Sequence, residues 1–373
     1  MIYISIDNNY HFEQASKLIH KLDLTRSEFV IIKHNSIRNT NIDETDLEVV
    51  RLDGHPLSDG MSFKNIFAYL RVYQKALRIK SILRFAKNDV LIIFTEYQLN
   101  NAIYAKEIKK AGGCVYLFDE GIGFYFNNSF LHKNSNPLKH FIFKYIFFLI
   151  GLPVVSKNAQ EGIVFSIKDC FIDKVFLRMN IPINRNVPVN ASPITDFEDK
   201  NFDSKRIVIF FAANFDCFKL KKEEMDLASK TITHLLGAFS KVFIKIHPSD
   251  YHAKNDVFDF YNSFNDEKLR LIDNSIDAVK AIELFKPEIV VGSMSTVLFD
   301  ALSKGVEPVF TYHLLPHVKN FQVYTYTLAN LGYNFIKSID EISSEYKSGI
   351  DKHNLFGKSS SAIDLMEDFR WQE

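Results

Sequence analysis

The chain of 373 residues lacks the features that mark secreted, membrane-spanning or zinc-binding proteins. Its three cysteines, Cys114, Cys170 and Cys217, are scattered without a CxxC pair, so neither a disulfide framework nor a zinc site is expected. The first residues lack the basic start and apolar core of a signal peptide. No run of roughly 18 apolar residues occurs, which argues against a spanning helix. We therefore expect a cytoplasmic protein.

Charge of one sign is also lacking, because 45 basic residues balance 45 acidic residues. A net charge of zero gives no overall electrostatic attraction to nucleic acid, so we expect no nucleic-acid partner. With 47% hydrophobic residues the chain can bury substantial cores, and its length is typical of about two domains.

Several motifs of nucleotide and metal enzymes are absent from the sequence. There is no GxxxxGK[ST] loop, no GxGxxG after a strand, no GxSxG elbow and no HExxH pair. A convincing Asp-x-Asp loop for a metal-held nucleotide sugar is also missing. These absences favour a mechanism without metal, in which a helix terminus and side chains stabilise phosphate.

Short apolar segments alternate with helical patterns along the chain, which predicts an α/β fold with parallel sheets. The expected strands of the first half are Ile2–Ile6, Phe29–Lys33, Val90–Thr95, Val115–Phe118 and Gly162–Ser166. Those of the second half are Arg206–Phe211, Val242–Ile246, Leu269–Ile272, Ile289–Val291 and Pro308–Thr311.

A proline-rich segment separates these halves and predicts a linker. We place the first domain at 1–185, the linker at 186–205 and the second domain at 206–373, with the last helix crossing back as an open alternative. Two such halves predict two Rossmann-like parallel-sheet domains that face each other across a cleft. Ligands of such sheets bind beyond the carboxyl ends of the strands.

Three helical patterns lie in the first half. Residues 63–85 carry apolar side chains at three- and four-residue spacing. Residues 98–110 form a second pattern, which Gly112 and Gly113 are expected to end. The third, Phe141–Val155, is rich in aromatic residues; we favour a buried helix there over a membrane-surface helix.

The first candidate motif, Asp119-Glu120-Gly121, directly follows an expected strand. A carboxylate at the mouth of a cleft can accept the proton of an attacking hydroxyl group. The glycine lets a substrate approach the backbone. An ordinary acidic loop is the plain alternative.

The second motif is His247-Pro248 at the end of another expected strand. Proline restricts the preceding histidine to an extended backbone, which holds the imidazole at the strand end. A protonated histidine there could bind a departing phosphate. A surface turn that contains histidine is the alternative.

The third motif, Ser293-Met294-Ser295-Thr296, lies between a strand and a helix. Hydroxyl groups and free N–H groups at a helix start form an anion site. The same residues are preferred helix caps, and one residue could serve both purposes. Two further candidates for the same nucleotide are Glu283, which could accept hydrogen bonds from a ribose diol or a base, and Asn214.

These three motifs, in this order, resemble the bacterial sialyltransferases of GT-B architecture. The extended pieces around Asp119–Gly123 and Ile282–Thr296 are most similar to the capsular polysialyltransferases, and the lipooligosaccharide sialyltransferases are also similar. The resemblance covers roughly residues 115 to 305.

The resemblance implies an inverting, metal-independent transfer of sialic acid, or a related nonulosonic acid, from its CMP-activated donor. It implies that Glu120 is the general base, with Asp119 beside it, and that His247 is the acid or the phosphate partner. Ser295, Thr296 and Ser293 would hold the phosphate, Glu283 the cytidine, and Pro248 and Gly121 would line the donor site. No cofactor is implied.

The expected partners are the CMP-sugar donor and a bacterial surface glycan or glycolipid in capsule, lipooligosaccharide or O-antigen synthesis. Peripheral contact with the cytoplasmic face of the inner membrane is a further hypothesis. Two alternatives stay open: a capsule or teichoic-acid transferase that uses CMP-Kdo or a CDP-polyol, and a non-catalytic nucleotide- or glycan-binding protein of the same fold.

Overall fold

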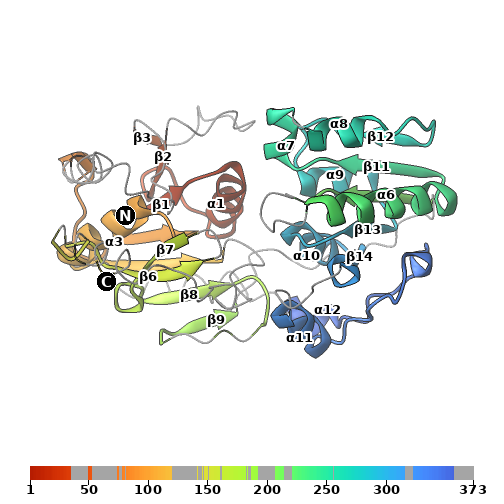
Figure 1. The fold of residues 1–373 in the computed structure, drawn as a ribbon. Coiled ribbons are helices and arrows are strands. Elements are labelled where there is room, and N and C mark those ends of the chain that lie inside the picture. Colours follow the sequence, from red (N-terminus) through yellow and green to blue (C-terminus); the bar gives the residue numbers. More distant parts are fainter. Residues whose placement is uncertain are drawn as a thin grey trace. The chain divides into compact units, whose positions relative to one another are not determined.

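A computed structural model provides the fold of the chain. It describes residues 1–34, 49–52, 74, 78–79, 81–119, 141, 145, 147–149, 151–159, 162–181, 183, 186–191, 206–213, 221–254, 256–315 and 322–356. The described residues form two compact units, the first within Met1–Thr195 and the second within Asp196–Phe356. Figure 1 colours the chain from red in the first unit to blue in the second.

The first unit contains a parallel sheet of seven strands in the order β3-β2-β1-β4-β5-β8-β9. This order extends the doubly wound order of dinucleotide-binding folds by one strand, with the switch point between β1 and β4. Its strands are β1 (Ile2–Ile6), β2 (Phe29–His34), β3 (Val49–Leu52), β4 (Val90–Ile93), β5 (Cys114–Phe118), β8 (Lys174–Leu177) and β9 (Val189–Ala191).

Helices cover the sheet of the first unit. The helix α1 (Asn9–Lys21) begins after Asn8, whose side chain accepts a hydrogen bond from the backbone N–H of His11. The helix α3 (Leu99–Ala111) ends at Gly112, which has a left-handed φ of 87°, as the sequence predicted. A short 3-10 helix, Asp169–Phe171, precedes β8.

The core of the first unit lies between this sheet and α1. Its members are buried aliphatic and aromatic side chains from both layers, among them Ile4, Phe12, Leu18, Ile92 and Phe118. The central strands β1, β4 and β5 are buried on both faces over most of their length, as parallel strands covered by helices should be. Truncation of one such side chain to alanine typically costs roughly 2–5 kcal/mol.

The second unit contains a parallel sheet of five strands in the order β12-β11-β10-β13-β14. The strands are β10 (Ile207–Phe211), β11 (Lys241–Lys245), β12 (Leu269–Leu271), β13 (Ile289–Gly292) and β14 (Glu307–Phe310). The order is again doubly wound, with the switch point between β10 and β13.

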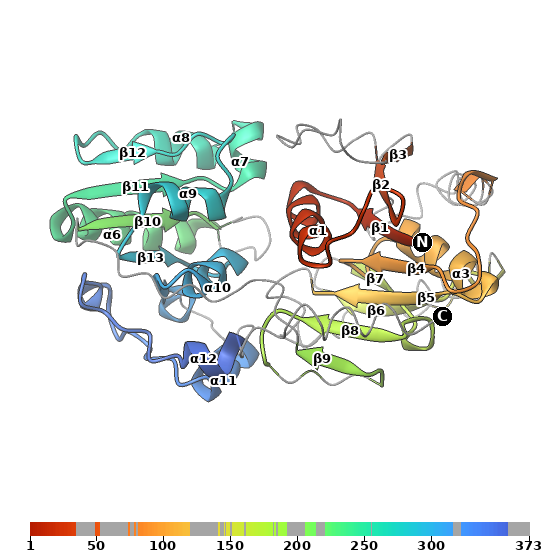
Figure 2. The same ribbon diagram turned by 180° about the vertical axis from the view of Figure 1, so that it is seen from behind.

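Helices lie on both faces of this second sheet. Figure 1 shows α6 on the near face, and Figure 2, from behind, shows α9 and α10 on the other. The helices are α6 (Lys221–Ala238), α7 (Pro248–Ala253), α8 (Asp256–Asn262), α9 (Ala278–Phe285), α10 (Thr296–Ser303), α11 (Gln322–Asn330) and α12 (Lys352–Phe356), with 3-10 helices at Tyr312–Leu314 and Ile339–Glu341. The core of this unit packs α6 and α8 against the sheet.

One expected strand has a different role. The sequence predicts Gly162–Ser166 in the parallel sheet, but β7 (Gly162–Ile167) pairs antiparallel with β6 (Val154–Ala159) in a separate two-stranded sheet. The backbone N–H of Ile167 donates to the carbonyl of Glu96, which ties this hairpin to the segment after β4. An apolar pattern predicts a strand but not the strand with which it pairs. Here β7 pairs with β6, the strand that precedes it in the sequence.

The predicted domain bounds stay a prediction. The strand β9 (Val189–Ala191) pairs with β8, so the first sheet includes part of the segment that the sequence assigns to the linker. Residues 192–205 lie outside the described residues. The chain end after residue 356, for which the sequence offers a helix that crosses back, lies outside them as well. Most of the helical pattern 63–85 lies outside them too.

The aromatic segment near residue 145 is helical at several described positions and exposes apolar side chains. Phe141, Tyr145, Phe148 and Leu149 are 56–76% exposed, whereas Phe147 is buried. The interpretation as a buried helix over Phe141–Val155 is therefore wrong for these four residues, and it is also wrong at its end, because Val154 and Val155 lie in a strand. No helix among the described residues is long and apolar enough to cross a membrane.

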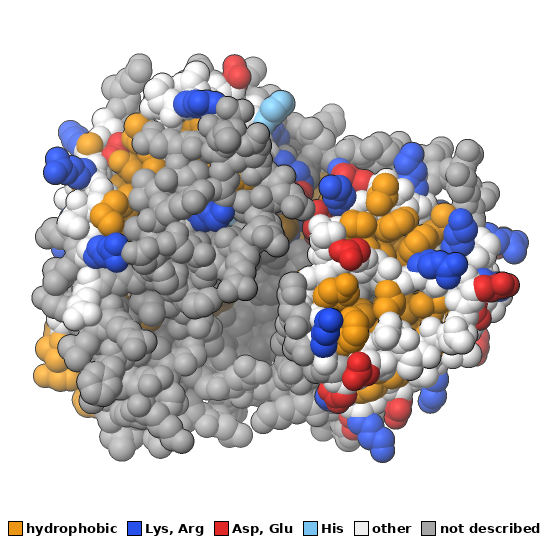
Figure 3. Space-filling view, turned by 90° about the horizontal axis from the view of Figure 1, so that it is seen from above, with side chains coloured by type: hydrophobic (Ala, Val, Ile, Leu, Met, Phe, Trp, Pro, Cys, Tyr) orange, Lys and Arg blue, Asp and Glu red, His pale blue; other side chains and the backbone are white. Residues whose placement is uncertain are grey.

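Charged side chains of both signs are interspersed on the face of the second unit that Figure 3 shows on the right. Acidic and basic groups alternate there with apolar side chains, so no field of one sign covers the described part of this face.

Candidate active site

The carboxyl edge of the second sheet brings two of the three motifs together. Phe211 of β10 pairs with Lys245 of β11 and with Gly292 of β13, and Gly292 pairs with Phe310 of β14. The residues that follow these strands therefore lie along one edge. His247 follows β11 and the Ser293–Thr296 turn follows β13, as the sequence predicted.

His247 lies at the start of α7. Its carbonyl accepts hydrogen bonds from the backbone N–H groups of Asp250 and Tyr251, at 3.1 and 3.0 Å, and Pro248 is the first helical residue. Burial lowers the pKa of His247; Asp250 opposes this effect and Lys245 adds to it. Before a ligand binds, the imidazole is therefore mainly neutral at pH 7, and an arriving anion would favour its protonated form.

The Ser293–Thr296 turn leads into α10. Ser295 is its N-cap, and its hydroxyl oxygen accepts a hydrogen bond from the backbone N–H of Val297 at 3.4 Å. Capping uses an oxygen lone pair and leaves the hydroxyl hydrogen for a ligand. Thr296, half-buried, is the first residue of the helix. Capping and anion binding are thus compatible at this turn.

Gly292 is required for close packing rather than for a left-handed turn. A Cβ atom at this position would lie 3.1 Å from the carbonyl oxygen of Phe211 in the neighbouring strand. Contacts this short require the neighbour to move. The glycine therefore fixes how closely β13 approaches β10 just before the hydroxyl-rich turn.

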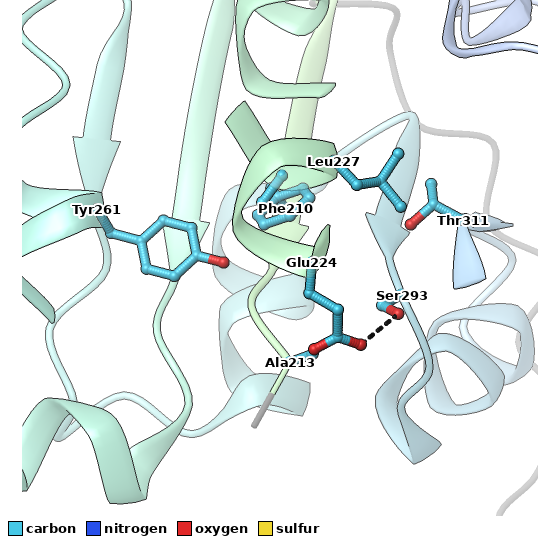
Figure 4. Close-up of a pocket in the computed structure, with 8 residues that line it drawn as sticks. Phe210, Ala213, Glu224, Leu227, Tyr261, Ser293 and Thr311 are labelled. Carbon is cyan, nitrogen blue, oxygen red and sulfur yellow. Dashed lines mark hydrogen bonds between the residues drawn. The ribbon is translucent and has the colours of Figure 1, made fainter. Parts of the chain in front are cut away.

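A buried carboxylate that sequence reasoning missed lies under this turn. Glu224, in the first turn of α6, is 3% exposed, and its Oε1 accepts a hydrogen bond from the Ser293 hydroxyl at 3.4 Å. Figure 4 shows both side chains at one small cavity. That cavity is lined by Phe210, Ala213, Glu224, Leu227, Ala228, Tyr261, Ser293 and Thr311.

Burial raises the pKa of Glu224 from 4.5 to about 7, and the hydrogen bond from Ser293 opposes this rise. The sequence does hold a pattern that could have identified it. Glu224 shares the helical stripe of the buried residues Ala228, Thr231 and Leu235, whereas Glu223 lies off it. A carboxylate on an apolar stripe is a candidate buried acid.

The first unit places Asp119 directly after β5, where it is buried. Its carboxylate pairs with the guanidinium of Arg178 at 2.7 Å and also accepts a hydrogen bond from the Arg178 backbone N–H. Asp119 therefore anchors the strand end, and both its oxygens are engaged by Arg178. Glu120, Gly121 and Asn214 lie outside the described residues.

Glu283 is not brought to the other predicted donor residues. Its carboxylate pairs with the Lys304 ammonium at 2.9 Å and is half exposed. Lys304 follows the last residue of α10, whereas the Ser293–Thr296 turn leads into the first. The helix between them, of 8 residues, spans roughly 12 Å.

Within the part of the chain that the structure describes, no group of three or more His, Cys, Asp or Glu side chains could hold a metal ion. The donor-side candidates of that part, His247 and the hydroxyl-bearing turn, are instead groups that hydrogen-bond an anion.

A family model matches most of the chain. The model of the alpha-2,8-polysialyltransferase family matches residues 3–305, which include all three motifs. No curated protein sequence matches the chain.

Solved structures with low identity share the fold. The spinosyn forosaminyltransferase SpnP is 9% identical with a TM-score of 0.50, and the match covers 100% of this chain and 95% of that one. The UDP-GlcNAc 2-epimerase of Methanocaldococcus jannaschii, with UDP-GlcNAc and UDP, is 11% identical with a TM-score of 0.52 over 99% of both chains. The structure of S. aureus MnaA with UDP is 10% identical with a TM-score of 0.53, and the match covers 99% of this chain and 96% of that one.

These matches show that the chain has the GT-B fold, with two Rossmann-like units. A transferase and an epimerase are both among them, so the fold alone does not select the reaction.

Proposed function

The chain belongs to the alpha-2,8-polysialyltransferase family and is a glycosyltransferase, and we propose that it transfers sialic acid from CMP-sialic acid to a hydroxyl group of a bacterial surface glycan. The observation that carries this proposal is the shared strand edge of His247 and the Ser293–Thr296 turn in the second unit. An imidazole and several hydroxyl groups at that edge suit the single phosphate of a CMP donor.

We propose an inverting mechanism. The acceptor hydroxyl attacks the anomeric carbon as the bond from that carbon to the phosphate oxygen breaks, and CMP leaves. Glu120 accepts the hydroxyl proton, and His247 donates a hydrogen bond to the phosphate as its charge grows. Ser295 and Thr296 hold the phosphate from the start of α10, near Pro248. This set of groups supplies the charge stabilisation without a metal.

The test is release of CMP by the purified protein with an acceptor glycan and a panel of donors: CMP-sialic acid, CMP-Kdo and CDP-glycerol. We expect turnover of CMP-sialic acid, unchanged by EDTA. Turnover of CMP-Kdo or CDP-glycerol, with none of CMP-sialic acid, would overturn the donor assignment. Binding without turnover of any donor would favour a non-catalytic protein.

Two substitutions test the roles of the proposed acid and base. Glu120→Gln should abolish transfer while donor binding largely survives, and His247→Ala should reduce transfer by at least about a hundredfold. Glu107→Gln, on α3, and His234→Ala, on α6, are matched controls that should stay active. Equal losses in the controls would count against both roles.

The exposed apolar residues near position 145 support a proposal of peripheral membrane contact. Phe148 and Leu149 are 76% and 65% exposed, and basic residues, Lys139 and Lys144, lie nearby in the sequence. Apolar side chains beside basic residues favour anionic lipid surfaces. The membrane would carry the acceptor.

Sedimentation with vesicles of phosphatidylglycerol and phosphatidylethanolamine tests this contact. Phe148→Ser with Leu149→Ser should reduce binding several-fold. Tyr326→Ser removes a similarly exposed aromatic side chain from α11 and should leave binding unchanged. Absence of wild-type binding would refute the contact.

A further inference from the structure

Glu224 presents an unusual carboxylate beside the proposed donor turn. Its Oε1 has the Ser293 hydroxyl at 3.4 Å, which is long for a hydrogen bond between two oxygens. Among the described residues no group hydrogen-bonds its Oε2, although the atom is buried. A buried carboxylate with only one long hydrogen bond destabilises the folded protein when it is charged.

The cavity beside this carboxylate is too small for a whole nucleotide sugar. Its volume of about 10 Å³ is room for roughly one water molecule, so no nucleotide sugar fits inside it. The cavity therefore lies beside the donor site rather than forming it. Glu224 reaches a ligand through Ser293, which makes it a positioning residue.

The titratable groups around Glu224 leave it without a compensating positive charge at the cavity. Tyr261 of α8 lines the cavity, and burial raises its pKa well above 10, so it is neutral. Asp250 of α7 acts on the same tyrosine and adds negative charge nearby. β13 and β14 are followed by Ser293 and Thr311, which do not titrate. None of the charged groups on the neighbouring elements lines the cavity; they are Lys221, Lys222, Glu223, Asp226, Lys230 and His234 of α6, Asp256 and Asp259 of α8, and Lys245 and His247 at β11.

We propose that Glu224 must be protonated for the donor to bind fully, and that donor binding therefore takes up a proton from solvent at this side chain wherever the unliganded protein holds it ionised. In the neutral acid the Oε1–H group donates to the Ser293 oxygen. The Ser293 hydroxyl hydrogen is then released from Glu224 and donates to the donor phosphate. In the carboxylate form Ser293 donates to Glu224 instead, and two negative groups lie on either side of one hydroxyl.

The hydrogen bond from the Ser293 hydroxyl to Glu224 is long, at 3.4 Å, and therefore weak. Little free energy is lost when the hydroxyl turns from Glu224 toward the phosphate. The pKa of about 7 means that both forms of Glu224 are populated near neutral pH. Affinity for a donor should therefore fall as pH rises above about 7. The inference rests on the proposed function, since Ser293 is taken to contact the donor phosphate.

The test measures binding of CMP-3-fluorosialic acid by calorimetry at about pH 6.5, 7.5 and 8.5. The fluorine disfavours the oxocarbenium-like transition state, so the analogue stays intact, and its phosphodiester does not titrate in this range. We expect the wild-type Kd to rise about fivefold to tenfold between pH 7.5 and 8.5. For Glu224→Gln, whose amide can donate to Ser293 at any pH, the rise should be smaller by about this factor, and any rise that remains comes from His247, which both proteins share.

Proton uptake gives a second readout. Calorimetry in two buffers of different ionisation enthalpy should show about one more proton bound per donor in the wild type than in Glu224→Gln at about pH 8. Any protonation of His247 is common to both proteins and cancels. Glu223→Gln removes the same charge from the same helical turn and should behave as the wild type.

A second variant, Ser293→Ala, tests the proposal even if Glu224→Gln does not fold. Ser293→Ala removes the hydroxyl that links Glu224 to the phosphate and should lower affinity most at about pH 6.5. Equal pH dependence in the wild type, Glu224→Gln and Ser293→Ala would overturn the inference while the donor assignment stands. If the wild type bound no analogue at any pH, the proposed function would fail and this inference with it.

Discussion

The two units each place a buried carboxylate near the carboxyl edge of a parallel sheet, but they give it different partners. In the first unit Asp119 contacts the Arg178 guanidinium at 2.7 Å and its backbone N–H. In the second unit Glu224 contacts the Ser293 hydroxyl at 3.4 Å. Both acids are almost fully buried; Asp119 belongs to one motif of the proposed reaction, and Glu224 contacts another.

The partner decides what each acid can do. A carboxylate that is held by a buried guanidinium and a backbone N–H group is fixed in position and stabilises the local backbone. A carboxylate held by one hydroxyl group keeps a pKa near 7 and can change charge when a ligand arrives. Sequence position alone assigned Asp119 to the chemistry and overlooked Glu224.

Breaking the Asp119–Arg178 pair should have the largest effect on stability. Arg178→Met leaves a buried carboxylate without its cation, which typically costs roughly 3–5 kcal/mol. Urea denaturation followed by circular dichroism measures the loss. Lys109→Met breaks the half-exposed pair with Asp173 and should cost no more than about 1 kcal/mol.

A second variant sharpens this result. Arg178→Met combined with Asp119→Asn removes the unpaired charge and should recover part of the lost stability. If Arg178→Met cost no more than Lys109→Met, Asp119 would not be anchored as the geometry indicates.

Glu224→Gln should have the opposite effect on stability, and the effect should depend on pH. The rise in pKa from 4.5 to about 7 destabilises the folded wild type by roughly 3 kcal/mol above pH 7. Because the folded acid holds its proton longer than the unfolded acid, this penalty is absent below about pH 4.5 and grows as pH rises to 7. The increase in the free energy of unfolding caused by Glu224→Gln should therefore be about 2 kcal/mol larger at about pH 8 than at about pH 5.

Urea denaturation at the two pH values checks this gain, with Glu223→Gln as the control. A gain of equal size at both pH values would mean that Glu224 does not titrate in this window. A gain in the control as well would indicate a general effect of charge on α6.

The sequence predicted the central strands of both sheets because each is a run of buried, β-branched residues bounded by polar loops. Ile2–Ile6 and Ile207–Phe211 are examples. It missed β3, β6, β8 and β9, each of which contains a charged or amide side chain. Such a side chain interrupts the apolar run that indicates a buried strand.

The candidate site was predictable where it depended on strand ends. His247 and Ser293 follow buried strands, and parallel strands bring their carboxyl ends to one edge. The contacts between side chains from distant elements were not predictable. The partners of Glu224 and Asp119 lie 69 and 59 residues away in the chain, and tertiary packing alone brings them together.

The smallest effect is expected at Glu283, whose carboxylate pairs with Lys304 and is half exposed. Exposed ion pairs contribute roughly 0.2–1 kcal/mol, because solvent screens the charges. Glu283→Ala should therefore leave the free energy of unfolding within about 1 kcal/mol of the wild type, and the donor-analogue Kd within about twofold. Lys304→Ala breaks the same pair from the other side and should give the same result. A loss of donor affinity of about tenfold or more in Glu283→Ala, with Lys304→Ala unchanged, would instead support the contact with cytidine that the resemblance implies, and would require the pair to open when the donor binds.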